Sequence, residues 1–129
     1  MADAPSSLTL LGSTQREPVT GLECFEAPEH VTEVRFTSAE LTSLCPVTGQ
    51  PDFSTVEITY RPRKRCVESK SLKLYLWSFR ERQAFAEALA AEIAGEVQRA
   101  AEPAWVRVTI AQSVRGGIAL TATAQLGEH

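Results

Sequence analysis

Histidine and cysteine, the residues that most often bind zinc, are scarce in this chain of 129 residues. It has two histidines, one of them the terminal His129, three cysteines and no Cys-x-x-Cys pair, so we expect no metal site. An odd number of cysteines excludes a fully paired disulfide framework and favours a reducing compartment. The cysteine content therefore predicts a cytoplasmic protein.

Long apolar runs and an excess of positive charge are also missing. No run approaches the roughly 20 residues that cross a bilayer, and the start, MADAPSS, lacks the basic and apolar parts of a secretory signal. The net charge of −3 does not suit a nucleic-acid backbone as partner. With 43% hydrophobic and 22% charged residues, we expect one soluble globular domain that binds neither membrane nor nucleic acid.

Regular patterns begin only after the first 28 residues, which are rich in Pro, Ser, Thr and Glu. We expect residues 1–28 to form an arm that lies on a surface of this chain or of a neighbour. Residues 29–126 are predicted to form the single domain. Within it, alternating apolar positions predict strands at 30–37, 54–62, 104–112 and 116–125, with the bend between the last two within 113–117.

Two helices are expected between the second and third strands. Residues 67–81 fit both strand and helix spacing, and Ser69 or Ser71 as N-cap favours the helix. The second helix, within 85–102, ends before Pro103 and carries an apolar stripe made of Phe85, Leu89, Ile93 and Val97.

The order strand, strand, helix, helix, strand, strand predicts the α+β class. We expect a four-stranded antiparallel sheet with both helices on one face. Such a sheet has exposed edges and a small core, so sheets that join side by side in an oligomer are expected.

Cys45 stands in an unusual place, within the turn-rich stretch SLCPVTGQPD that ends at Asp52. Pro46 suits the first position of a short helical turn, whose backbone N–H groups would favour a thiolate at Cys45. Asp52 could then serve as proton donor, provided that burial or a nearby anion raises the pKa of a carboxyl. The alternative is a packed cysteine and a turn-capping aspartate, since no histidine stands nearby as a base.

Three further clusters have both a functional and a structural interpretation. The stretch VESKSLK (67–73) suits a phosphate or simply a capped helix start. Arg115-Gly116-Gly117 suits a ligand that approaches the backbone or simply a hairpin turn. Glu87 could bind a ligand, or its carboxylate could simply stabilise the first turn of the helix through the helix dipole. Cys24 and Cys66 are interpreted as incidental.

Together these stretches resemble the 7-cyano-7-deazaguanine reductases, the nitrile reductases of queuosine biosynthesis and transfer-RNA modification, in their single-module form. The resemblance runs from about Leu10 to about Ile118, and SLCPVTGQPDF followed by VESKSLKLYLWSFR is its most specific part. It implies the tunnelling fold, in which such units assemble into a barrel as pentameric rings or a decamer. It also implies active sites between subunits of this homo-oligomer.

The resemblance also implies roles for individual residues. Cys45 would form a covalent thioimide with the nitrile of 7-cyano-7-deazaguanine, and Asp52 would donate a proton. The base would be bound by Val67, Glu68, Ser69, Ala86 and Glu87. The NADPH cofactor would be bound by Ser69, Lys70, Lys73, Arg115 and Gly116. Two hydrides would then give 7-aminomethyl-7-deazaguanine.

One position departs from the family pattern. The family has Phe-His-Glu where this chain has Phe85-Ala86-Glu87. A lost hydrogen bond costs about 0.5–1.5 kcal/mol, or up to about 3 kcal/mol if its partner stays buried. Two alternatives follow. One is a thioimide-forming relative that adds ammonia, an amine or water, as archaeal amidine-forming relatives do. The other is a non-catalytic deazaguanine-binding homologue.

Overall fold

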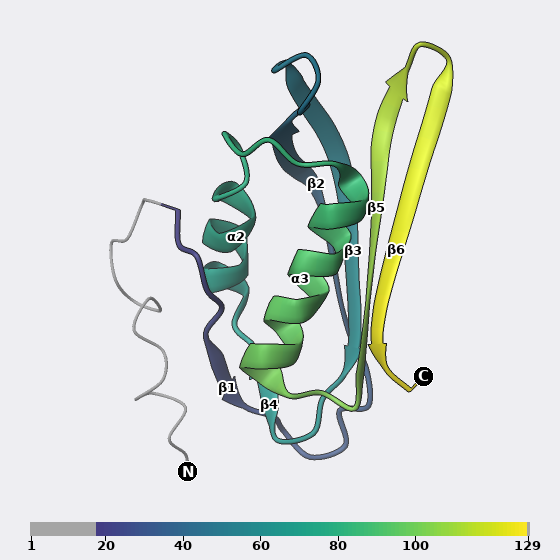
Figure 1. Cartoon of the computed structure of the whole chain (residues 1–129). Helices are drawn as coiled ribbons and strands as arrows, with labels where there is room; N and C mark the ends of the chain where they lie inside the picture. The colour runs from purple at the N-terminus through teal and green to yellow at the C-terminus, as the bar shows by residue number, and fades with distance from the viewer. Residues whose placement is uncertain (1–17, 129) are drawn as a thin grey trace.

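A four-stranded antiparallel sheet forms the centre of the fold, as the sequence predicted (Figure 1). The computed structural model describes residues 18–128. The strands lie side by side in the order β2 (Val34–Leu44), β3 (Pro51–Arg61), β5 (Trp105–Arg115) and β6 (Ile118–Gly127). Alternate residues of a strand point to opposite faces, and Val56, Ile58 and Tyr60 of β3 are at most 1% exposed. The alternate apolar residues of the strand therefore form the buried face of the sheet.

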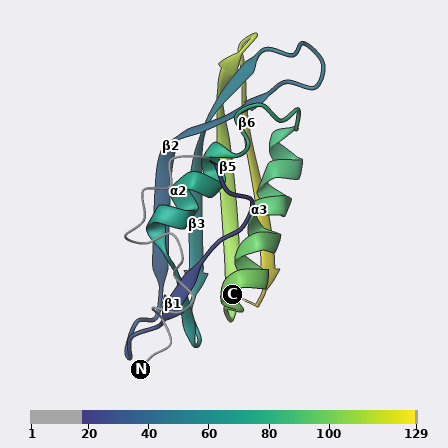
Figure 2. The ribbon, with the colours of Figure 1, turned by 90° about the vertical axis from the view of Figure 1, so that its left-hand side faces the viewer.

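Helices α2 (Ser69–Trp77) and α3 (Ala86–Ala101) cover that one face, which confirms the α+β prediction (Figure 2). The α3 stripe of Leu89, Ile93 and Val97 is buried as expected. The prediction was wrong for Phe85, which precedes the helix in an extended conformation and is 56% exposed. Helix spacing alone does not show where the first turn begins.

The N-cap of α2 differs from both serines that the sequence suggested. The carboxylate of Glu68 accepts the N–H groups of Lys70 at 2.7 Å and Ser71 at 2.8 Å. The hydroxyl of Ser71 instead accepts the N–H of Glu23 at 2.9 Å. One carboxylate thus satisfies two of the N–H groups that a helix start leaves without partners.

A second sheet, which the sequence did not predict, pairs β1 (Cys24–Glu26) with β4 (Arg65–Val67). Strands this short show no period that could reveal them. The pairing holds part of the expected arm against the domain, with Leu22 and Cys24 in the core. Cys66 is also buried. Burial raises the pKa of Cys24 to about 11 and also raises that of Cys66, so both stay as protonated thiols, which are poor nucleophiles.

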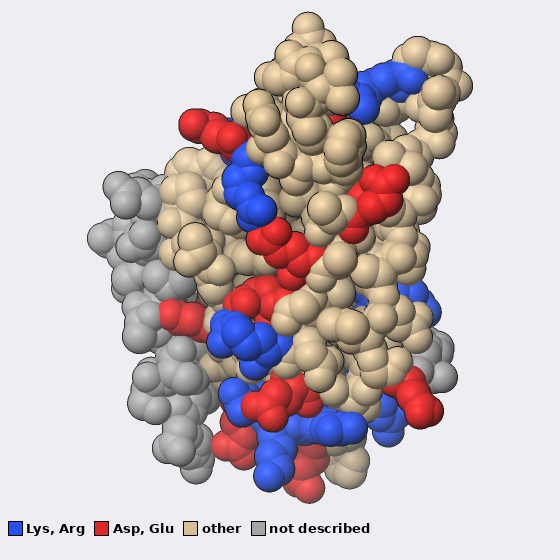
Figure 3. Space-filling model, viewed as in Figure 1, with Lys and Arg blue, Asp and Glu red and all other residues tan. Residues whose placement is uncertain are grey.

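The helices leave the opposite face of the sheet uncovered in the described chain (Figure 2). Strands β2 and β6 are its two edges. Figure 3 shows acidic and basic side chains mixed over the helices and the lower end, while the upper end is mostly uncharged. Across residues 18–128, no helix has the length and apolar character that crossing a membrane demands.

Candidate active site

The loop between β2 and β3 holds Cys45 at its first position. The Cys45 N–H donates to the carbonyl of Gln50, and the Gly49 N–H donates to the carbonyl of Cys45, both at 2.8 Å. Gly49 has a φ of 74°, a conformation that favours glycine. The loop therefore closes tightly, and residues 46–48 form a turn directly after the cysteine.

This turn surrounds the sulfur of Cys45 with hydrogen-bond donors. The hydroxyl of Thr48 has the largest effect on the thiol, followed by the backbone N–H groups of Thr48 and Val47, and Arg115 adds to it. These donors lower the pKa of Cys45 to about 7, although burial acts against them. A substantial fraction of the thiol is thus a nucleophilic thiolate at neutral pH, without a histidine beside it.

Asp52 lies on β3, not in the loop where the sequence placed it. It pairs across the strands with Ser43, two residues before Cys45. Asp52 itself is only 3% exposed. Arg115 of β5 contacts its carboxyl and also acts on the Cys45 thiol, so the carboxyl and the sulfur lie near the same guanidinium.

Side chains of β5 reach over to this carboxyl. The guanidinium of Arg115 forms an ion pair with Asp52, joining Nη1 to Oδ1. Nε2 of Gln112 lies 3.5 Å from the other carboxylate oxygen. The structure thus brings together Cys45, Asp52 and Arg115, three of the predicted site residues, from the β2–β3 loop, β3 and β5.

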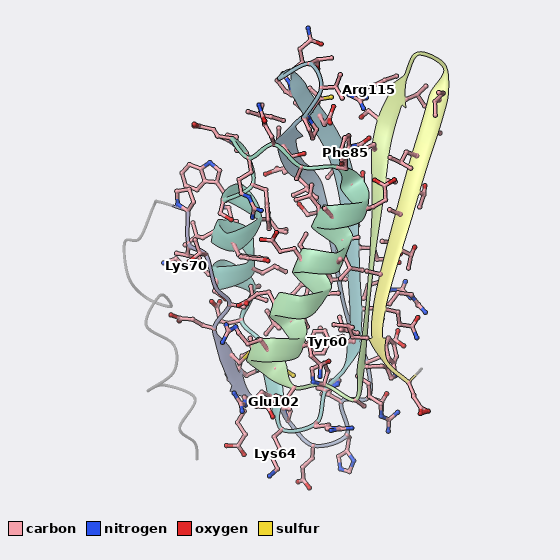
Figure 4. All side chains as sticks on the ribbon, viewed as in Figure 1. Tyr60, Lys64, Lys70, Phe85, Glu102 and Arg115 are labelled. Carbon is pink, nitrogen blue, oxygen red and sulfur yellow. The ribbon has the colours of Figure 1, made fainter. Side chains whose placement is uncertain are left out.

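The start of α3 lies at the same end of the molecule, and Figure 4 shows Phe85 there, on the same side as Arg115. The Ala84 N–H donates to the carbonyl of Leu44, the residue before Cys45, at 3.1 Å. Glu87 is exposed in the first turn of α3, whereas Ala86 is only 1% exposed and packs in the core. Sequence reasoning treated Phe85 as a core residue and missed it as an exposed aromatic beside Glu87.

A second group of predicted residues lies at the start of α2. The Val67 N–H donates to the hydroxyl of Tyr60 at 2.7 Å, and the Glu68 N–H donates to the carbonyl of Glu23 at 2.8 Å. The carboxylate of Glu68 caps α2, and its carbonyl accepts the N–H of Leu72 and the hydroxyl of Ser71. These contacts fix the backbone of Val67, Glu68 and Ser69 firmly.

A pocket of about 290 Å³ lies between α2 and the edge strand β2. Its helix wall includes the predicted Ser69 and Lys73, and its strand wall includes Phe36. Trp77, the last residue of α2, and Arg80, three residues beyond its end, also line the pocket, and sequence reasoning missed both. Their spacing from Lys73 along one face of the helix expected over 67–81 was the signal that could have found them.

These two groups do not meet within the single chain. Lys70 lies on the flank of α2, away from the end where Arg115 and Phe85 lie (Figure 4). One copy therefore presents Cys45, Asp52, Arg115 and Glu87 at one place, and the backbone of 67–69 with the α2 pocket at another.

A family model described as "QueF-like protein" matches residues 51–129. The "NADPH-dependent 7-cyano-7-deazaguanine reductase" of Anaeromyxobacter sp. (strain Fw109-5) is 45% identical over 88% of this chain and 94% of its own. The protein of that name from Alkalilimnicola ehrlichii (strain ATCC BAA-1101 / DSM 17681 / MLHE-1) is 48% identical over 84% of this chain and 86% of its own.

A solved structure with the same architecture is the archaeosine synthase QueF-Like in the apo form. It superposes with a TM-score of 0.73 and 27% identity, over 81% of this chain and 99% of that one. This likeness confirms the tunnelling fold that the resemblance implied. By sequence and by structure, the chain belongs to the QueF-like family.

Proposed function

We propose that this protein uses NADPH to reduce the nitrile of 7-cyano-7-deazaguanine to an aminomethyl group. Relatives at 44–48% identity that span most of the chain carry the name of that reductase. The observation that carries the proposal is the thiol of Cys45, whose pKa is lowered to about 7, near the same Arg115 guanidinium that contacts the buried carboxyl of Asp52. A nucleophile next to a proton carrier is what addition to a nitrile requires.

In the first step, the Cys45 sulfur bonds to the nitrile carbon while Asp52 gives a proton to the nitrile nitrogen. The product is a neutral thioimide, whose carbon accepts hydride far better than a nitrile carbon does. When bound, NADPH supplies hydride, and two equivalents are needed. The first hydride expels the Cys45 thiolate and leaves an imine, and the second, with a proton, gives the amine.

Recognition of the base falls to the start of α3 and to the backbone of residues 67–69. The carboxylate of Glu87 suits the amino and ring N–H groups of a guanine-like edge. The exposed ring of Phe85 suits stacking on a flat heterocycle. The buried methyl of Ala86 offers little surface, so base binding rests mainly on its neighbours.

The pocket beside α2 fits a phosphorylated cofactor. Lys73 and Arg80 line it, and the guanidinium of Arg80 lies 5.5 Å from the ring centre of Trp77. We assign the cofactor to this pocket with Ser69 and Lys70, and to Arg115 and Gly116 at the β5–β6 turn. Cations and open backbone of this kind suit phosphate groups.

We propose that a second copy of the chain completes the site. Arg115, which contacts Asp52, and Lys70 of α2 are separate in one chain (Figure 4), while β2 and β6 present free sheet edges. Joining β6 of one copy to β2 of the next would extend the sheet toward a closed barrel. A cytoplasmic homo-oligomer with active sites between copies would then contain every assigned residue.

The direct test is NADPH oxidation at 340 nm with 7-cyano-7-deazaguanine, together with identification of the product by mass. We expect two NADPH consumed for each aminomethyl product. No consumption by folded, assembled protein would contradict the proposal.

The structural likeness to an archaeosine synthase keeps one alternative in view, in which ammonia, an amine or water attacks the thioimide. The identity to that protein is 27%, against 44–48% to the reductases. The cationic side chains of Lys73 and Arg80 beside α2 also favour an enzyme that binds a phosphorylated cofactor. An amidine or amide product would identify the alternative, and tight base binding without any adduct would identify a non-catalytic homologue.

A further inference from the structure

Arg115 has two competing anionic partners, one in the structure and one in the proposed function. In this structure its guanidinium pairs with the carboxylate of Asp52, and in the proposed function it contacts the cofactor. The two partners differ in their surroundings: the side chain of Asp52 is 3% exposed and that of Arg115 is 51% exposed. Only the guanidinium of this pair faces solvent. An incoming anion can therefore reach Arg115 but not Asp52.

The backbone at Arg115 suits a side chain that changes partners. The register between β5 and β6 shifts between Gln112 and Arg115, so Arg115, which pairs with Ile118, lies past an irregularity in the ladder. Gly116 and Gly117 follow with φ values of 58° and 77°. Apart from chain neighbours, no described atom lies within 4 Å of where a Cβ would stand on either glycine. The tip of the hairpin is therefore open on the side where a ligand would arrive.

The sulfur of Cys45 needs the same cation only for part of the reaction. Arg115 is among the groups that favour its thiolate. Once the thioimide has formed, that sulfur is neutral and no longer needs a positive neighbour. Arg115 then becomes available at the stage when the cofactor is required.

We propose that Arg115 is exchanged between Asp52 and a phosphate of the cofactor, so that cofactor binding removes the cationic partner of the Asp52 carboxylate. This inference rests on the proposed function for the identity of the anion. Arg115 is thus a positioning residue for Asp52 as well as a cofactor ligand.

Exchange of this kind is reciprocal, which makes it measurable without turnover. If cofactor binding breaks the ion pair, then removing the ion pair in advance must strengthen cofactor binding by the same free energy. Asp52→Asn removes the charge and nearly preserves the shape. We expect Asp52→Asn to bind NADP⁺ about 5- to 50-fold more tightly than the wild type, within the usual range of coupling between sites.

The measurement is the Kd of NADP⁺ for the assembled full-length chain, without substrate, at fixed pH and salt. Glu102→Gln is the matched control, since it removes the same charge from an exposed ion pair with Arg65 at the other end of the molecule (Figure 4). We expect a change below twofold there. In an Arg115→Ala background, NADP⁺ should bind more weakly, and Asp52→Asn should add no further tightening.

Each outcome bears on the proposal. A wild-type chain that binds no NADP⁺ would overturn both the proposed function and the exchange. Wild-type binding with an unchanged or weaker Kd in Asp52→Asn would overturn the exchange alone, because Arg115 would then hold both anions at once. Asp52→Ser, with thermal melts of every variant, serves as the second neutral variant if Asp52→Asn does not fold.

Discussion

The carbonyl of Leu44 accepts the N–H of Ala84 at 3.1 Å, and the Leu44 N–H donates to the carbonyl of Arg82 at 2.8 Å. These two hydrogen bonds join the end of β2 to the segment that leads into α3. Cys45 follows Leu44 directly, and Glu87 lies in the first turn after Ala84. The pairing therefore brings the proposed nucleophile and the proposed base-binding carboxylate to one end of the fold.

Glu87→Gln tests the role of that carboxylate in base recognition. We expect KM for 7-cyano-7-deazaguanine to rise about 10- to 100-fold, because a hydrogen bond to a charged group contributes about 1.5–3 kcal/mol. The kcat should change much less, since the proposed contact of Glu87 is with the base and not with the nitrile. Steady-state kinetics measure both values, with Glu102→Gln as a control for loss of charge. A fall in kcat at constant KM would contradict the assignment.

Cys45→Ala should abolish both turnover and covalent adduct formation. Addition of a thiol to a nitrile loses no atoms, so intact mass spectrometry of wild-type protein without NADPH should show a gain equal to the whole substrate. The variant should fold and show no gain.

Cys66→Ala is the matched control, because burial raises the pKa of that thiol and keeps it protonated. It should form the adduct as the wild type does. An adduct that survives in Cys45→Ala would place the nucleophile elsewhere.

Thr48→Val should shift the pH dependence of thiol reactivity. The Thr48 hydroxyl makes the largest contribution to the low pKa of Cys45. The thiolate exists above the pKa, so iodoacetamide should react with wild-type Cys45 with a midpoint near pH 7. Without the hydroxyl, the pKa rises and the midpoint moves to higher pH.

The backbone N–H groups of Val47 and Thr48 remain in that variant, so the pKa shift should be partial. Thr48→Ser keeps a hydroxyl and should stay near the wild type. Identical midpoints in all three proteins would show that the hydroxyl does not contact the sulfur.

Much of the fold was predictable because its main elements carry local signals. Alternation along β3 and β5 and the stripe of α3 each repeat over several residues, which a single sequence reveals. β1 and β4 are too short to repeat. They exist because the two segments pair with each other, a fact that neither segment shows by itself.

The sequence singled out candidate site residues, which stay a prediction, but it did not show how they are arranged. Asp52 follows Pro51 and a run of turn formers, which suggested a loop, but pairing with Ser43 draws it into a strand. The ion pair with Arg115 joins residues 63 apart in sequence. No local pattern marks it, since it depends on how β3 and β5 align.

Tyr60→Phe tests how firmly the predicted substrate segment is held. Tyr60 is fully buried, and its hydroxyl accepts the N–H of Val67. Phenylalanine keeps the ring but leaves that buried N–H without its partner, which costs about 1–3 kcal/mol. We expect the free energy of unfolding in urea to fall by that amount, measured at constant protein concentration because assembly contributes to stability.

Thr109→Val is the matched control for Tyr60→Phe. It also removes a hydroxyl, one that lies 3.1 Å from the hydroxyl of Thr123 on the exposed face of the sheet. Water can replace that partner, so the change should stay within about 0.5 kcal/mol. Equal losses in the two variants would mean that the backbone of Val67 finds another acceptor. The start of α2 would then owe its position to the Glu68 cap and the pairing with β1 instead.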